Sequence, residues 1–221
     1  MSLSTGPDVK KQLAHILWIG GATDSGKSTV AGMLAEHWNI PVYHFDRADA
    51  RQSDTLARSV PEVSQFLQAS LEERWIQPTP EMMFEYLLLT FPYRFRLVIE
   101  DLLDMPHDQP VIVEGFGLLP ELVHPVLYSS NQAIWFVPTD AFKWNSVLHR
   151  NKPSFASQVS DPQKARMNLV ARDKMLADYY RQQVPAYGYR LLEIDGSCSV
   201  EEVTHLVEIH FSKYMPTMLS H

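Results

Sequence analysis

The sequence predicts an α/β protein built around a parallel sheet, and three observations support this. Short apolar runs alternate with segments of helical periodicity along most of the 221 residues, as in repeated strand–helix–strand units. The run at residues 111–113 is apolar without alternation, which is typical of a strand buried on both faces. The first apolar run ends in a glycine-rich turn that leads into a helical pattern. We therefore expect one domain, residues 15–221, after a mobile leader at residues 1–14.

Apolar runs and their periods define the individual elements. The expected strands are residues 15–19, 42–45, 111–113, 133–137 and 189–194. The expected helices are residues 27–38, 139–150, 162–183 and 200–214.

A long, mostly helical region separates the second and third strands. It covers about residues 54–105 and is expected to form an insertion over the substrate side, although plain packing helices fit its pattern nearly as well. Thr79 and Pro80 predict a helix start, because threonine caps a helix and proline suits its first position. Pro92 is expected to kink or end that helix and leave a second helical segment.

Charge and composition exclude some classes of protein. The net charge is −7, which argues against partners such as nucleic acid or an anionic membrane surface. The most apolar long stretch, residues 82–105, carries six charged residues and is therefore a poor membrane span. Cys198 is the single cysteine, so no disulfide forms within the chain, and a cytoplasmic location is expected. A homodimer is the commonest assembly for such a protein.

A phosphate-binding loop of the pattern G-x-x-x-x-G-K-S follows the first strand and precedes the first long helix, the context that this pattern requires. Its glycines let successive backbone N–H groups face the phosphates of a nucleoside triphosphate. Lys27 is expected to reach the β- and γ-phosphates, Ser28 to ligate Mg²⁺, and Thr29 to contact the α-phosphate. The expected nucleotide-binding residues are Gly21, Ala22, Thr23, Asp24, Ser25, Gly26, Lys27, Ser28 and Thr29.

Several motifs together resemble the small-molecule kinase branch of P-loop proteins, which includes adenylate, shikimate, gluconate and uridine kinases. They are the loop, the strand ending in Asp46, the V-I-V-E-G strand, the arginines around residues 151–172 and the closing L-L-E-I-D-G-S stretch. No single kinase is matched. The resemblance implies a three-layer fold with a parallel five-stranded sheet of order 2-3-1-4-5. It also implies ATP and Mg²⁺ as cofactors and a small-molecule phosphoryl acceptor.

Two carboxylates are candidates for the chemistry. Glu114 ends a buried apolar strand and is expected to hold the Mg²⁺ shell, or else to cap the turn at Gly115. The resemblance implies that Asp46 holds the acceptor hydroxyl or takes its proton, and Asp49 is a weaker candidate. The alternative for Asp46 is an N-cap of the following helix.

A lid at about residues 151–172 is implied by the same resemblance. Arg150 is expected to stabilise the transferring phosphoryl group, and Arg166 and Arg172 are further lid candidates. For Arg166 and Arg172 the alternative is ordinary helix-surface charge, with pairing to Asp173 or Asp178.

An aromatic stretch with interspersed arginines lies in the helical insertion. It either stacks on a ring of the acceptor or belongs to the core. Its members are Arg74, Trp75, Tyr86, Phe91, Tyr93, Arg94, Phe95 and Arg96.

The function predicted from all these features is ATP- and Mg²⁺-dependent phosphorylation of a small metabolite, with Lys27, Asp46 and Arg150 as catalytic residues. Two alternatives stay open. One is a nucleotide-dependent switch without transfer activity, and the other is a kinase that acts on a nucleic-acid end, which the acidic balance disfavours.

Overall fold

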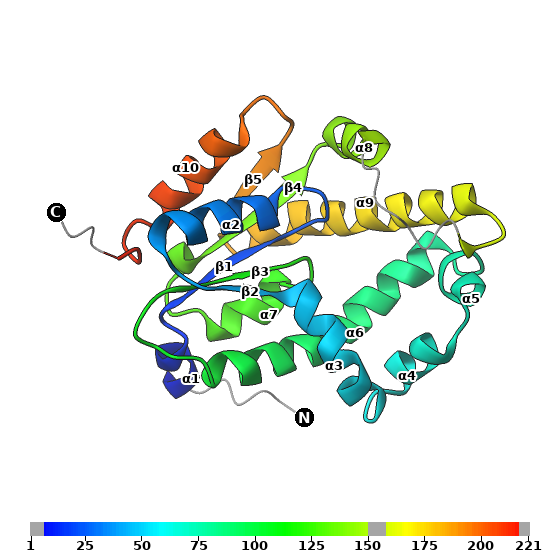
Figure 1. Cartoon of the computed structure of the whole chain (residues 1–221), viewed down its shortest axis with the longest axis horizontal. Helices are drawn as coiled ribbons and strands as arrows, with labels where there is room; N and C mark the ends of the chain where they lie inside the picture. Colours follow the sequence, from blue (N-terminus) through cyan, green and yellow to red (C-terminus); the bar gives the residue numbers. More distant parts are fainter. Residues whose placement is uncertain (1–6, 150–157, 217–221) are drawn as a thin grey trace.

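The computed structural model describes residues 7–149 and 158–216, and its centre is a five-stranded parallel sheet (Figure 1). The strands are β1 (Ile16–Gly21), β2 (Val42–His44), β3 (Val111–Glu114), β4 (Ala133–Pro138) and β5 (Arg190–Ile194). Their order is β2-β3-β1-β4-β5, and each pair of neighbours is parallel. The predicted fold class and strand order are confirmed.

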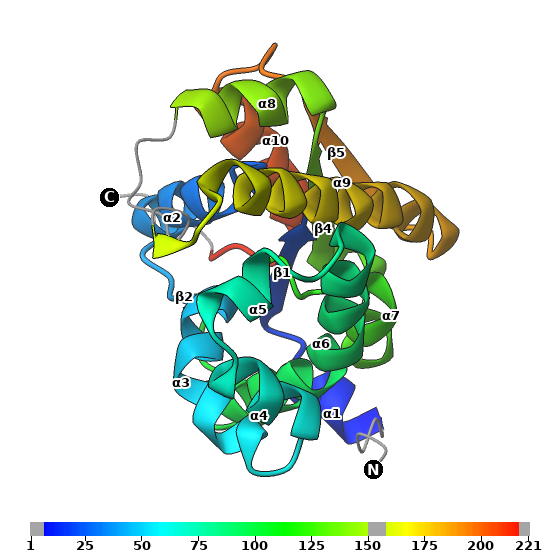
Figure 2. The same ribbon diagram turned by 90° about the vertical axis from the view of Figure 1, so that its right-hand side faces the viewer.

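Helices cover both faces of the sheet and extend beyond its carboxyl edge. They are α1 (Pro7–Gln12), α2 (Lys27–Trp38), α3 (Phe45–Ala57), α4 (Pro61–Gln68), α5 (Leu71–Trp75), α6 (Pro80–Leu103), α7 (Pro120–Val123), α8 (Asp140–His149), α9 (Pro162–Ala186) and α10 (Val200–Phe211). In Figure 2, which looks onto the right-hand side of Figure 1, α9 lies above the group α3 to α6. The expected helices are found with ends shifted by a few residues, which is normal for element boundaries.

Strand β1 shows how the sequence builds the two cores. Successive side chains of a strand point to opposite faces. Leu17 and Ile19 pack with α2 and α10 on one face, whereas Ile16 and Trp18 pack with α6, α7 and α9 on the other. All six residues of β1 are buried, so the continuous apolar run follows from burial on both faces.

Two details of the helical insertion differ from the sequence prediction. Helix α3 begins at Phe45, so the helical region starts well before residue 54. Helix α6 begins after its cap Thr79 as predicted, but it continues through Pro92 instead of leaving a second segment. Phe91 and Phe95, on either side of the proline, are buried in the core. Their packing compensates for the backbone hydrogen bond that Pro92 cannot donate, and the helix therefore continues.

Within residues 7–149 and 158–216, the structure contains no helix with both the length and the apolar character that a membrane span requires.

Candidate active site

The phosphate-binding loop connects the buried end of β1 to the first turn of α2. Gly21 has a φ of 120°, and a Cβ at this position would lie 2.0 Å from the carbonyl oxygen of Phe136. Gly26, the N-cap of α2, has a φ of 84°. Asp24 also has a positive φ, 60°, which aspartate tolerates better than most residues. The loop therefore requires glycine where β4 approaches and where the helix begins, and it brings the N-terminus of α2 to the end of the sheet.

A polar cavity of about 270 Å³ lies over this loop. Its walls are residues 23–29 together with Asp46, Glu114 and Phe116. Lys27 is buried, and its Nζ donates to the Ala22 carbonyl oxygen at 2.5 Å and to Ser25 Oγ at 3.3 Å. Burial lowers the pKa of Lys27, and the nearby carboxylates of Glu114, Asp46 and Asp24 oppose this effect. The loop therefore places the buried ammonium group of Lys27 beside the backbone N–H groups at the N-terminus of α2. This arrangement suits the binding of a polyphosphate.

Two oxygen ligands meet on one wall of the cavity. Ser28 Oγ donates to Glu114 Oε2 at 2.9 Å, and the side chain of Glu114 is only 2% exposed. His44 Nδ1, at the end of β2, lies 2.6 Å from Glu114 Oε1 and fixes that carboxylate from the other side. Hydroxyl and carboxylate oxygens are the donors that Mg²⁺ prefers, so Ser28 and Glu114 fit the predicted metal. No cluster of three or more His, Cys, Asp or Glu suited to a metal occurs among the described residues.

Asp46 lines the same cavity from a different element than the sequence predicted. It lies in the first turn of α3, because β2 ends at His44, so the prediction that Asp46 ends the strand is wrong. The α3 N-cap is His44, so the alternative of an N-cap role for Asp46 also fails. Desolvation is the largest cause that raises the pKa of Asp46 to about 6; Lys27 opposes it and Glu114 adds to it. The residue is still exposed to the open cavity, so it can reach a ligand there.

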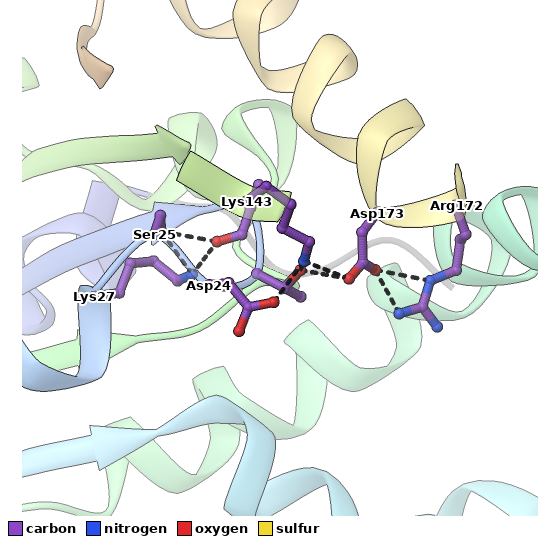
Figure 3. A network of polar contacts seen from close by, with 8 residues as sticks. Asp24, Ser25, Lys27, Lys143, Arg172 and Asp173 are labelled. Atoms are coloured by element: carbon purple, nitrogen blue, oxygen red, sulfur yellow. Dashed lines mark hydrogen bonds and ion pairs between the residues drawn. The ribbon is translucent and has the colours of Figure 1, made fainter. Parts of the chain in front are cut away.

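A chain of charged side chains fixes the loop to α8 and α9 (Figure 3). Lys143 Nζ, from α8, donates to Thr23 Oγ1 and Asp24 Oδ2, both at 2.6 Å, and to Asp173 Oδ2 at 2.8 Å. Thr23 Oγ1 also donates to Asp173 Oδ2 at 2.6 Å. On the far side, Arg172 Nη2 lies 2.6 Å from Asp173 Oδ1. Burial acts to raise the pKa of Asp173, but Arg172 and Lys143 overcome it and leave the pKa below its usual value.

We expect Lys143→Met to lower the free energy of unfolding by about 1–3 kcal/mol, because two buried carboxylates lose a donor. Lys143 and its partners Asp24 and Asp173 are each only 11% exposed at their side chains. Lys174→Met is the matched control, since Lys174 pairs with Asp140 on the surface, where both side chains are more than half exposed. This control should lose less than about 0.5 kcal/mol. Equal losses in urea unfolding would contradict the structural role of Lys143.

The lid candidates occupy three different situations. Arg150 lies outside the described residues, as do residues 151–157. Arg166 is exposed on α9. Arg172 is held by Asp173 in the interior of α9, which matches the alternative of pairing with that residue. The lid itself stays a prediction, and the side chain of Asp49 is also outside the described part.

Sequence analysis missed three members of the site: His44, Lys143 and Asp173. Asp173 had been weighed only as a pairing partner of Arg166 and Arg172, and the structure pairs it with Arg172. Lys143 follows the carboxyl end of β4 by one helical turn. Because the carboxyl ends of parallel strands meet at one edge of the sheet, that position was a signal available in the sequence. His44 carries no such signal, since a lone histidine at a strand end is common.

Comparison with known proteins identifies no family for this chain, but it does find solved structures that resemble it. No protein-family model matches the chain, and no curated protein matches it. A shikimate kinase from Aquifex aeolicus has 17% identity, coverage of 90% of this chain and 96% of its own, and a TM-score of 0.37. A gluconokinase from Sinorhizobium meliloti has 13% identity, coverage of 92% and 94%, and a TM-score of 0.41. The TT1252 protein from Thermus thermophilus has 21% identity, coverage of 88% and 96%, and a TM-score of 0.47.

The class of this protein follows from its own topology and loop. A parallel sheet of order β2-β3-β1-β4-β5, with the G-x-x-x-x-G-K-S loop between β1 and α2, defines the P-loop nucleotide-binding fold. In this chain, helices α3 to α6 are inserted between β2 and β3 at the carboxyl edge of the sheet.

Proposed function

We propose that the protein transfers the γ-phosphoryl group of ATP, with Mg²⁺, to the hydroxyl group of a small molecule. One observation carries this proposal: the buried Lys27, the Ser28–Glu114 oxygen pair and the carboxylate of Asp46 line a single cavity. A site that only binds nucleotide needs the lysine and the metal ligands. The partly desolvated carboxylate of Asp46 in the same cavity adds a group that can orient an acceptor hydroxyl and take its proton.

Each residue has one task in this mechanism. The acceptor oxygen attacks the γ-phosphorus and forms the new P–O bond. The bond between the γ-phosphorus and the β–γ bridging oxygen breaks, and ADP leaves with its electron pair. Asp46 orients the hydroxyl and takes its proton. Lys27 and the N-terminal N–H groups of α2 stabilise the charge on the transferring group. Mg²⁺ bound by Ser28 and Glu114 would neutralise the β- and γ-phosphate oxygens.

A second cavity, of about 160 Å³, suits the nucleoside end of ATP. It lies between α8 and α9 and shares Thr23 with the phosphate cavity. Trp144, which is 53% exposed, forms part of its wall beside Lys143. An indole face next to a phosphate site favours the stacking of a base, and this supports a nucleotide with its base on the α8 side.

The decisive measurement is ATP consumption with Mg²⁺ against nucleosides, sugars, hydroxy acids and phosphorylated metabolites. We expect one acceptor class to stimulate turnover by at least about tenfold over the acceptor-free rate, and chelation of Mg²⁺ to abolish it. Tight ATP binding without stimulation by any acceptor would instead favour the switch protein. Stimulation only by nucleic-acid ends, with steep salt dependence, would favour the nucleic-acid kinase.

A further inference from the structure

Helix α9 contacts two parts of the candidate site from one of its faces. Asp173 Oδ2 accepts from Thr23 Oγ1 of the phosphate-binding loop at 2.6 Å. Seven residues further along α9, the hydroxyl group of Tyr180 donates to the backbone carbonyl oxygen of Phe116 at 2.8 Å. Residues seven apart lie about two turns along the same face of an α-helix. A single rigid element therefore binds both the loop and the connection that follows β3.

Phe116 lies beside Asp46 in the wall of the phosphate cavity. Its ring meets the ring of Phe45, the residue before Asp46, at a centroid distance of 6.3 Å. Desolvation is the largest effect on the pKa of Asp46 and raises it, whereas a hydrogen bond from the backbone N–H of Phe116 lowers it. Phe116 thus has its carbonyl oxygen bound by Tyr180 and its N–H directed at the Asp46 carboxylate.

Two glycines let the connection after β3 pack directly against the start of α3. A Cβ at Gly115 would lie 2.3 Å from the Cβ of Phe45, and a Cβ at Gly117 would lie 2.2 Å from Cζ of the same ring. Neither position can hold a side chain unless Phe45 moves. The ring of Phe45 therefore lies against both neighbours of Phe116. Because Asp46 is the next residue in α3, a shift of this connection is expected to shift the carboxylate as well.

Tyr180 is a buried polar residue that the proposed mechanism does not use. Its side chain is 0% exposed. Burial is the main cause that raises its pKa well above the usual value, and a hydrogen bond from the backbone of Gly21 opposes this effect. The hydroxyl group therefore keeps its proton at neutral pH and acts as a donor. A hydroxyl group is costly to bury unless it forms a hydrogen bond, and here that bond goes to Phe116.

We infer that Tyr180 is a positioning residue for Asp46: by holding Phe116, it sets where the Asp46 carboxylate lies relative to the phosphate-binding loop. The loop itself is held by Asp173 of the same helix face, so α9 keeps the distance between the loop and the carboxylate fixed. The task of Asp46 in this inference rests on the proposed function, but the way in which Asp46 is held does not. In-line transfer is sensitive to such placement, since an error of about 1 Å can cost about 10²-fold in rate.

Tyr180→Phe removes only the hydroxyl group, and Tyr179→Phe is the matched control. Tyr179 is the preceding residue of α9, and its hydroxyl group binds Glu121 of α7 instead of Phe116. Each variant loses one hydrogen bond of a tyrosine that is at least partly buried, so each should lower Tm by about 2–6 °C. If both tyrosines served packing alone, the two variants would show this loss of stability and no other difference.

NMR of the free protein tests the placement of Asp46 without any acceptor. The ¹³C signal of its carboxyl group, assigned with Asp46→Asn, should titrate with a midpoint of about pH 6 in the wild-type protein. In Tyr180→Phe the Phe116 N–H is no longer held toward the carboxylate, so the charged form loses a donor and the midpoint should rise by about 0.5 pH unit or more. Tyr179→Phe should keep the wild-type midpoint.

A measurement on the wild-type protein does not depend on the folding of any variant. The backbone amide signal of Phe116 should shift with the same midpoint as the Asp46 carboxyl group, because the two groups are joined by a hydrogen bond. This shift should disappear in Asp46→Asn.

Transfer kinetics give a further readout with the acceptor that the substrate panel identifies. Tyr180→Phe should lower kcat about tenfold but leave KM for ATP within about twofold, since the loop and the proposed metal ligands are unchanged. Tyr179→Phe should match the wild-type protein in both constants. Equal kcat values in the two variants would contradict a positioning role for Tyr180.

The outcomes separate this inference from the proposed function. If Tyr180→Phe moves the Asp46 midpoint no further than Tyr179→Phe does, Tyr180 serves packing alone and the inference is overturned, whatever the protein catalyses. A Phe116 amide signal that does not follow the Asp46 titration would also overturn it. If the midpoint moves only in Tyr180→Phe, but no acceptor stimulates ATP turnover by the wild-type protein, the inference stands and the proposed function fails.

Discussion

Replacing Lys27 by alanine is expected to lower kcat for phosphoryl transfer by about 10²–10³-fold while the protein stays folded. The ammonium group lies in the loop, where it binds the Ala22 carbonyl oxygen and Ser25 Oγ. In the transition state the γ-phosphoryl oxygens carry charge that only a nearby cation and fixed N–H groups can stabilise. A rapid-quench or coupled ADP assay at saturating ATP and acceptor measures this loss.

Stability provides the control for the Lys27 experiment. Because burial lowers the pKa of Lys27, folding disfavours its charged form, and the lysine contributes little to stability. The free energy of unfolding of the variant should therefore lie within about 1 kcal/mol of the wild-type value. Lys27→Arg is the second control: it keeps the charge but replaces a point charge by a planar fork, so it should not restore the rate. Full turnover in Lys27→Ala would refute the proposed function.

The fold was predictable because its signals are local. The buried strands appear as continuous apolar runs, and the loop pattern fixes the β1–α2 junction, so an error of a residue at an element's end changes nothing essential. Pro92 shows the limit of local signals. Proline would break this helix in isolation. In the folded protein the buried rings of Phe91 and Phe95 keep α6 continuous, and their burial depends on tertiary packing.

The site was predictable where the chain itself brings residues together. Lys27 and Ser28 are adjacent in one motif, and Glu114 follows from a neighbouring strand of the sheet. The chain of Lys143, Asp173 and Arg172 joins α8 and α9 to the loop across more than a hundred residues, and no periodicity encodes that meeting. The same holds for the aromatic stretch: Phe91 and Phe95 belong to the core, whereas Trp75 and Tyr86 line a cavity. Sequence pattern alone does not distinguish aromatic residues of the core from those that line a cavity.

Asp46→Asn is expected to lower kcat/KM for the acceptor by about 10²–10⁴-fold at pH 7–8, because asparagine cannot take the hydroxyl proton. The pH profile gives the sharper result. The carboxyl group must be ionised to act, and its pKa is raised to about 6, chiefly by desolvation and further by Glu114 against the effect of Lys27. Since kcat/KM reports the free enzyme, its value in the wild-type protein should fall about tenfold per pH unit below pH 6.

The asparagine variant also has a stability signature with a definite sign. A carboxyl group whose folded pKa lies above the unfolded value of 3.8 stabilises the folded state below that value, and this contribution is lost as the pH rises through about 6. Wild-type stability should therefore decline relative to Asp46→Asn between about pH 4 and 7, as measured by urea unfolding. The residual kcat/KM of the variant should no longer fall as the pH drops below 6. If the variant keeps both this pH dependence and the wild-type rate, Asp46 neither orients nor deprotonates the acceptor, and another group in the cavity must do so.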